Sequence, residues 1–181
     1  MESLVEAHGL QFKPMISEEE ILNKVKELGQ QISEDYKGKR PLLLGVLNGA
    51  FIFAADLIRA LDIECEISFV KLASYRGLES SGNVSTLIGL ETDVTDRHVI
   101  LVEDIIDSGK TLSEFIPVLK NAGPASTALV SLLVKPDSIK HPIQIDYQGF
   151  EIPPAFVIGY GLDFNGLARN LKGIYQLADQ E

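Results

Sequence analysis

Residues 103–111 combine carboxylates, hydroxyls, a glycine and a lysine at a spacing suited to binding a phosphorylated sugar. Glu103 and Asp104 follow a short apolar run, and Asp107–Thr111 (Asp-Ser-Gly-Lys-Thr) leads into a helical pattern. Small and hydroxylated residues at a helix start let backbone N–H groups approach an anion, which the helix dipole also favours. Paired carboxylates can accept hydrogen bonds from neighbouring hydroxyls or attract a metal ion. The segment therefore predicts a ribose phosphate site, although the acidic pair alone also fits a solvated strand end.

The end of this segment, Gly109-Lys110-Thr111, is shared with the P-loop of nucleotide triphosphate-binding proteins, but the rest is not. A P-loop has a glycine five residues before its second glycine, and this chain has Asp104 there. Carboxylates in that position would also repel a triphosphate. These differences exclude a P-loop.

The surrounding pattern predicts strands and helices that alternate along the chain. Ser17 and Glu20 form a capping-box pattern before apolar residues that recur at helical spacing up to Ile32. Helices are also expected at residues 50–61 and 111–122, and strands at 42–47, 63–72, 98–102, 127–134, 143–149, 155–159 and 173–177. This order predicts an α/β fold with right-handed crossovers and a largely parallel sheet. In such a sheet, ligands bind beyond the carboxyl ends of the strands.

The composition fits one globular domain. The 181 residues, of which 45% are hydrophobic, are enough for one domain with its own core but too few for two typical domains. The 16 Lys and Arg against 26 Asp and Glu give a formal charge of −10, which disfavours nucleic acids and anionic membranes as partners. The single cysteine and the lack of a signal-peptide pattern or membrane-length apolar stretch predict a cytoplasmic protein with no membrane partner.

Residues 99–111 resemble the phosphoribosyl diphosphate signature of the type I phosphoribosyltransferases. That signature is an apolar strand, two acids, two apolar residues and then Asp-Thr/Ser-Gly-Lys/Arg-Thr, and every position is filled here. The resemblance implies the type I phosphoribosyltransferase fold: one domain (1–181) with a central, mostly parallel sheet flanked by helices. It also implies a small hood built from roughly residues 1–16 and 140–181. The same signature occurs in regulators and in diphosphate-sugar synthetases.

Further segments are similar to the hypoxanthine-guanine phosphoribosyltransferases and cover most of the chain. Leu47–Gly49 is similar to the family's pyrophosphate-binding loop, which carries a non-proline cis peptide. Family members often have Lys or Arg at the position of Asn48, so this chain has one positive charge less there. Ser74-Tyr75 matches the start of the mobile loop that closes over the reacting centre. Residues 74–85 also fit a hairpin tip between two strands.

Five further residues match the positions that bind the base, the metal ion and the leaving group. The resemblance implies that Lys135 donates to the exocyclic oxygen of a purine, which favours a 6-oxo base because an ammonium is only a donor. It implies that Phe156 stacks on the purine, that Val157 bonds its edge and that Asp163 lies near a magnesium site. Arg169 has the spacing of the pyrophosphate-binding arginine. Without the resemblance, Phe156 fits a core position and Lys135 a solvated strand end.

The resemblance thus gives each candidate site residue a role. Asp107 is the expected catalytic base. The residues expected to bind phosphoribosyl diphosphate are Leu47, Asn48, Gly49, Ser74, Tyr75, Glu103, Asp104, Asp107, Ser108, Gly109, Lys110, Thr111 and Arg169. Those expected to bind the purine are Ile105, Lys135, Phe156, Val157 and Asp163. Those expected to bind Mg²⁺, the implied cofactor, are Glu103, Asp104 and Asp163.

The predicted reaction transfers the phosphoribosyl group of phosphoribosyl diphosphate to hypoxanthine or guanine, giving IMP or GMP and pyrophosphate. Such a reaction serves purine salvage, and the resemblance also implies a homodimer or homotetramer. One alternative is a nucleotide-binding regulator of the same fold, including the RNA-binding attenuators. Another is a transferase for adenine, xanthine or orotate. A flavodoxin-like domain without this chemistry leaves the acidic loop, residues 102–111, unexplained.

Overall fold

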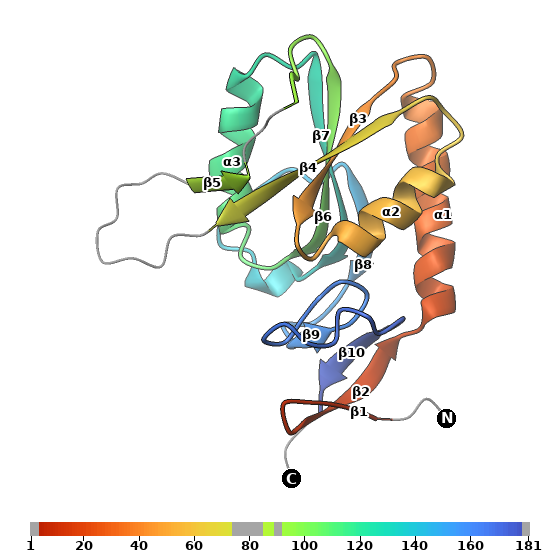
Figure 1. Ribbon diagram of the computed structural model, residues 1–181, viewed down its shortest axis with the longest axis vertical. Helices are drawn as coiled ribbons and strands as arrows, with labels where there is room; N and C mark the ends of the chain where they lie inside the picture. Colours follow the sequence, from red (N-terminus) through yellow and green to blue (C-terminus); the bar gives the residue numbers. More distant parts are fainter. Residues whose placement is uncertain (1–3, 74–84, 89–91, 179–181) are drawn as a thin grey trace.

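The computed structural model describes residues 4–73, 85–88 and 92–178, which form two β-sheets (Figure 1). The strands of the larger sheet are, in their order across it, β5 (Ser85–Ile88), β4 (Glu66–Ala73), β3 (Leu42–Leu47), β6 (His98–Ile106), β7 (Ser126–Val134) and β8 (Tyr147–Glu151). All neighbours pair in parallel except β5, which is antiparallel to β4. The largely parallel sheet predicted from the sequence is therefore confirmed.

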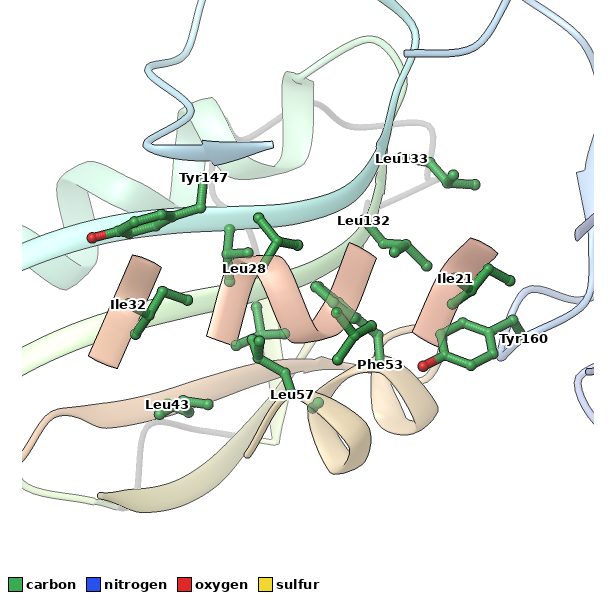
Figure 2. Close-up of a cluster of buried hydrophobic side chains, with 14 of the residues drawn as sticks. Ile21, Leu28, Ile32, Leu43, Phe53, Leu57, Leu132, Leu133, Tyr147 and Tyr160 are labelled. Carbon is green, nitrogen blue, oxygen red and sulfur yellow. The ribbon is translucent and has the colours of Figure 1, made fainter. Parts of the chain in front are cut away.

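The three α-helices of the described residues cover both faces of this sheet. Helices α1 (Glu18–Asp35) and α2 (Phe51–Ala60) pack on one face, and α3 (Lys110–Asn121) packs on the other. In β3, Leu43 belongs to the cluster under α1 and α2 (Figure 2), whereas Leu42 and Leu44 belong to the cluster under α3. Because successive side chains of a strand point to opposite faces, a sheet covered on both sides needs continuously apolar strands. Among the described helices, none is long and apolar enough to cross a membrane.

The smaller sheet is antiparallel and lies beyond the end of β3 (Figure 1). Its strands are β1 (Val5–Ala7), β2 (Leu10–Ile16), β10 (Ile174–Leu177) and β9 (Val157–Ile158), in that order. Phe12 and Ile158 are fully buried in its own small core. We propose that this sheet is the hood. Because β8 belongs to the larger sheet, the C-terminal part of the hood then begins after residue 151 rather than near 140.

Most predicted elements are present, and the main differences concern their ends. Strand β6 continues to Ile106, because its pairing with β7 extends to Ile106 and Val134. Glu103 and Asp104 therefore lie within the strand rather than after it. The strand expected at residues 143–149 begins only at Tyr147. The sequence pattern predicts no strands before residue 42, so the β1–β2 hairpin is an additional element.

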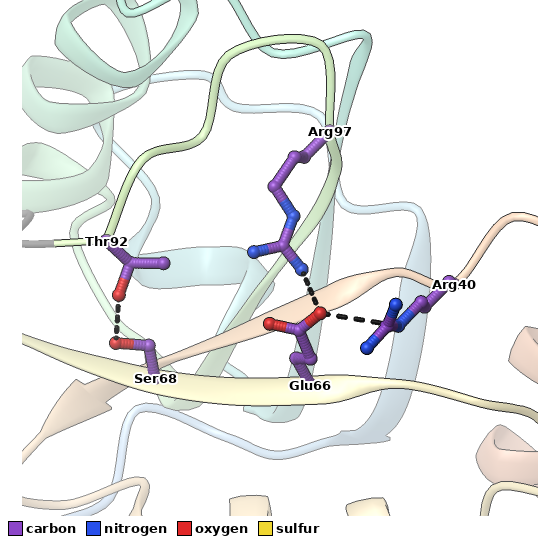
Figure 3. A network of polar contacts seen from close by, with 5 residues as sticks. All are labelled: Arg40, Glu66, Ser68, Thr92 and Arg97. Atoms are coloured by element: carbon purple, nitrogen blue, oxygen red, sulfur yellow. Dashed lines mark hydrogen bonds and ion pairs between the residues drawn. The ribbon is translucent and has the colours of Figure 1, made fainter.

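A charged network holds the amino ends of three strands of the larger sheet (Figure 3). Glu66, at the start of β4, pairs with Arg40 before β3 at 3.4 Å and with Arg97 before β6 at 3.0 Å. Nearby, the hydroxyls of Ser68 and Thr92 lie 2.8 Å apart. Polar side chains at this end of the sheet thus contact one another.

The capping box of α1 can be tested by substitution. Ser17 Oγ accepts a hydrogen bond from the Glu20 backbone at 3.3 Å, and the Glu20 carboxylate accepts one from the Ser17 backbone at 2.9 Å. We expect Ser17→Ala to lower the free energy of unfolding by about 1 kcal/mol. Gln31→Ala, at an exposed position of the same helix, is the control and should change it by less than about 0.5 kcal/mol. Equal losses in urea denaturation would contradict the capping role.

Candidate active site

The phosphate-binding loop predicted from the sequence lies between β6 and α3 and is held from behind by residues 140–141. Gly109 caps α3 with a φ of 77°, and a Cβ on it would lie 2.4 Å from the carbonyl oxygen of His141. Only glycine combines this backbone angle with such a close approach. The backbone N–H groups of Lys140 and His141 both donate to the Ser108 carbonyl at 3.0 Å. Sequence reasoning missed this support, because backbone contacts leave no signature in residue type.

The loop borders a pocket of about 210 Å³ at the carboxyl end of β6. It is lined by Val46, Leu72, Glu103, Ile105, Ile106, Asp107, Ser108, Gly109, Lys110, Thr111 and Leu112. The structure thus brings most of the acidic loop around one cavity at the N-terminal end of α3. An anion is favoured there by the helix dipole and by the backbone N–H groups that have no partner within the helix.

The Asp104 carboxylate is buried against the loop that follows β3. Its Oδ1 accepts a hydrogen bond from the Ile105 N–H at 2.8 Å. Its Oδ2 lies so close to Gly49 that a Cβ there would be 1.7 Å from it. In the same loop, the peptide bond between Leu47 and Asn48 is cis, as the family resemblance implied. The expected pyrophosphate loop and the expected ribose-binding acid are therefore in direct contact.

The ionised form of Glu103 is disfavoured by its surroundings. Its Oε1 accepts a hydrogen bond from the Asp104 N–H at 3.3 Å, and it lines the pocket. Burial, and then the neighbouring Asp104 carboxylate, raise the pKa of Glu103 well above its usual value. A cation or a hydrogen-bond donor that enters the pocket would relieve this cost.

Arg169 and Asp163 reach the same region from the loop between β9 and β10. Arg169 Nη1 donates to the Gly161 carbonyl at 2.6 Å, and Nη2 pairs with Asp163 at 2.8 Å. Asp163 also accepts a hydrogen bond from the Gly166 N–H at 2.7 Å. A Cβ on Gly161 would lie 2.1 Å from the Gly49 carbonyl oxygen, so this loop touches the one after β3. The predicted arginine is thereby placed beside the predicted pyrophosphate loop.

Lys135 and Asp107 form an ion pair at the carboxyl end of β7. Lys135 is only 7% exposed, and its Nζ lies 2.9 Å from Asp107 Oδ2. The Lys135 N–H also donates to the Ile106 carbonyl at 2.9 Å, which fixes its backbone to β6. The interpretation of Lys135 as a solvated strand end is therefore wrong. A buried ammonium beside a half-exposed carboxylate presents a donor and an acceptor together.

Phe156 is 45% exposed, which contradicts its interpretation as a core residue. Its ring contacts Phe12 and Phe164 at centroid distances of 6.2 and 5.4 Å. These two rings support the Phe156 ring and leave part of it accessible. Val157 is buried in the same cluster as Leu133, two residues before Lys135. No described contact joins Phe156 directly to the Lys135–Asp107 pair.

Part of the expected site lies outside the described residues, and the expected metal ligands do not converge within them. Ser74 and Tyr75 lie outside those residues. In the part of the chain that the structure describes, no three His, Cys, Asp or Glu side chains converge as a metal site. Glu103, Asp104 and Asp163 therefore do not form a ready-made metal cage, and Asp163 instead pairs with Arg169.

The raised pKa of Glu103 predicts a pH-dependent stability. As pH rises from the usual to the raised pKa, the unfolded chain loses this proton first, so the free energy of unfolding falls. Glu103→Gln cannot ionise and should melt at a higher temperature than the wild type, by roughly 2–4 °C per kcal/mol of relieved desolvation and repulsion. The difference should vanish near pH 4 and grow with pH.

Thermal melts across pH measure this effect. Glu114→Gln, at an exposed position of α3, is the matched control and should show no difference that grows with pH. A constant difference between Glu103→Gln and the wild type at all pH values would contradict the electrostatic account of Glu103.

Comparisons with known proteins identify the family of this chain. A phosphoribosyl transferase domain model matches residues 16–165. The hypoxanthine-guanine phosphoribosyltransferase of Bacillus subtilis is 46% identical over 163 residues, which are 90% of this chain and 91% of that protein. A relative of the same name in Lactococcus lactis is 44% identical over 160 residues, covering 88% and 87%.

Solved structures of the same family are also similar to this chain. A hypoxanthine-guanine phosphoribosyltransferase from Bacillus anthracis has a TM-score of 0.87 and 39% identity, covering 92% of this chain and 98% of that one. A variant of the hypoxanthine phosphoribosyltransferase from Trypanosoma cruzi has a TM-score of 0.86 and 40% identity, covering 92% and 95%. The chain therefore belongs to the phosphoribosyl transferase domain family.

Proposed function

We propose that this protein transfers the phosphoribosyl group of phosphoribosyl diphosphate to hypoxanthine or guanine, forming IMP or GMP and pyrophosphate in purine salvage. The buried Lys135–Asp107 ion pair beside the phosphate loop carries the proposal. Relatives named hypoxanthine-guanine phosphoribosyltransferase, matched over about nine-tenths of the chain, support it.

The ion pair suits one edge of a 6-oxo purine. O6 and N7 are neighbours on that edge. Lys135 donates to O6, and Asp107 accepts the proton from N7, which fits two groups that lie 2.9 Å apart. Adenine instead presents an amino group, so two donors would meet and Lys135 would lose its partner.

The other ligand groups follow from the arrangement of the loops. The 5-phosphate binds the Asp107–Thr111 backbone and hydroxyls at the start of α3. The ribose hydroxyls bind Glu103 and Asp104. The pyrophosphate binds the backbone amides of Leu47–Gly49 and the guanidinium of Arg169, which contacts that loop through Gly161.

Mg²⁺ fits the oxygen ligands of this site. Magnesium in proteins usually takes one or two carboxylates together with phosphate oxygens of the substrate. Glu103 and Asp104 supply carboxylates whose mutual repulsion a cation relieves, and Asp163 is our third candidate ligand. When bound, the ion neutralises charge on the pyrophosphate leaving group.

The chain's own residues then position the reactants and move one proton. The transition state of substitution at a sugar anomeric carbon resembles an oxocarbenium ion. The Glu103 and Asp104 carboxylates stabilise that positive charge, and Arg169 stabilises the departing pyrophosphate. Asp107 removes the purine proton as the ring nitrogen forms the new bond. We also propose that the protein acts in the cytoplasm as a homodimer or homotetramer, which sedimentation velocity distinguishes.

The direct test is pyrophosphate release with phosphoribosyl diphosphate, Mg²⁺ and hypoxanthine, guanine, xanthine or adenine. We expect kcat/KM for hypoxanthine or guanine to exceed that for adenine by about 10⁴-fold, because adenine leaves a buried donor unpaired. Retention of RNA without any pyrophosphate release would instead favour the regulator.

Lys135→Ala tests base selection in the same assay. We expect kcat/KM for hypoxanthine to fall by about 10- to 150-fold, as one hydrogen bond from a charged group is lost, and the preference over adenine to narrow. Lys140→Ala, which removes an exposed lysine five residues later, should leave both values unchanged. An unchanged preference in Lys135→Ala would count against the role of Lys135.

Asp107→Asn tests the proton transfer. Asparagine keeps the shape of the side chain and an oxygen for Lys135, but it cannot accept the proton. We therefore expect kcat to fall by about 10²- to 10⁴-fold. Asp137→Asn, at an exposed position nearby in the chain, is the control and should retain full activity. A normal kcat in Asp107→Asn would remove it from catalysis.

A further inference from the structure

Tyr160 has an unusual backbone conformation directly beside the active site. Its φ is 48°, and its neighbours Gly159 and Gly161 have φ values of 99° and 101°. Glycine adopts such angles readily, but an aromatic residue does so only when its surroundings hold it there. Tyr160 is 4% exposed and belongs to the buried cluster under α1 and α2. The contacts of its side chain must therefore maintain this turn.

The hydroxyl group of Tyr160 provides a specific contact with α2. It donates a hydrogen bond to Asp56 Oδ2 at 2.6 Å. Asp56 is partly exposed and also pairs with Arg59 at 3.6 Å, so the carboxylate keeps a partner if the phenol is lost. The backbone N–H of Tyr160 donates to the Leu171 carbonyl at 2.8 Å, which fixes the other side of the turn.

Both residues of this hydrogen bond lie on segments that form the proposed pyrophosphate site. Asp56 lies on α2, which follows directly after the Leu47–Gly49 loop. Gly161, next to Tyr160, approaches the Gly49 carbonyl oxygen and exchanges two hydrogen bonds with Arg169. The Tyr160–Asp56 bond thus joins the segment that carries the loop amides to the segment that carries the guanidinium.

We propose that Tyr160 is a positioning residue for phosphoribosyl diphosphate, which it serves by holding Gly161 and Arg169 against the Leu47–Gly49 loop through Asp56. The inference rests on the proposed function. Loss of the Tyr160 hydroxyl weakens binding of the diphosphate donor. It leaves the base site largely unchanged, because Lys135 and Asp107 are fixed by β7 and the end of β6.

The chain contains a matched control for this bond. The Tyr147 hydroxyl donates to Asp35 Oδ2, also at 2.6 Å. Figure 2 shows Tyr147 and Tyr160 at opposite ends of the same buried cluster. Tyr147 begins β8, two strands across the sheet from β6, and Asp35 ends α1 next to Tyr36, whose ring contacts His98 at the start of β6. Tyr147→Phe therefore removes an equivalent bond without a connection to the site.

The experiment compares steady-state kinetics and melting temperatures of the wild type, Tyr160→Phe and Tyr147→Phe. We expect Tyr160→Phe to raise KM for phosphoribosyl diphosphate by roughly three- to tenfold, the range for one hydrogen bond. KM for hypoxanthine should stay within about twofold, since no base contact is lost. Both variants should lower the melting temperature by similar amounts, because each loses one hydrogen bond. Tyr147→Phe should leave both KM values unchanged.

Two variants of Asp56 test the bond from its other side. Asp56→Asn retains an oxygen that accepts from the phenol, so KM for phosphoribosyl diphosphate should stay near the wild-type value. Asp56→Ala should reproduce Tyr160→Phe, and the double variant should be no worse than either single variant. These variants decide the question even where Tyr160→Phe does not fold.

A lower melting temperature without a change in KM for phosphoribosyl diphosphate, in Tyr160→Phe or Asp56→Ala, would reduce the bond to a structural role and overturn the proposal. Equal increases in both KM values would overturn it as well, because the effect would not be confined to the diphosphate donor. Failure of the wild type to release pyrophosphate is a separate outcome that removes the proposed function, and this inference falls with it.

Discussion

The structure depends on a close approach of three chain segments at Gly49. The Asp104 carboxylate from β6 lies on one side, at a point where a Cβ on Gly49 would be 1.7 Å away. The carbonyl oxygen of Gly49 lies against Gly161, at 2.1 Å from where a Cβ would be. Residues more than a hundred positions apart in sequence thereby come into contact, because two glycines leave no side chain between them. Arg169, the acidic pair and the cis peptide acquire a common place only through these contacts.

Two cations of the candidate site pair with carboxylates of the same site. Lys135 pairs with Asp107 and Arg169 with Asp163, while Glu103 has a raised pKa beside Asp104. A chain with a formal charge of −10 can in this way keep a local site for a highly charged anion. In the proposed function, ligand binding exchanges internal partners for ligand groups, which limits the cost of leaving buried charges unpaired. The proposed Mg²⁺ would also relieve the repulsion between Glu103 and Asp104.

The sequence predicts the elements with strong local signals and the residues of the acidic loop. The capping box of α1 and the apolar run of β3 are local patterns, and both elements appear near the expected positions. The extent of β6 depends on pairing with β7, and the support of Gly109 by His141 depends on backbone groups. The Tyr160–Asp56 bond joins residues 104 positions apart. Such features follow from tertiary packing, which one-dimensional spacing does not encode.

The most direct test of this account is binding of phosphoribosyl diphosphate with Mg²⁺ to Gly49→Ala, measured by calorimetry. The added Cβ must displace the Asp104 carboxylate, and a displacement of about 1 Å can cost on the order of 10²-fold in a positioned site. Asn48→Ala, which keeps the backbone amides of the same loop, is the control and should bind nearly as well as the wild type. The account predicts a loss of about 10²-fold in affinity for Gly49→Ala alone. Wild-type affinity in Gly49→Ala would contradict it.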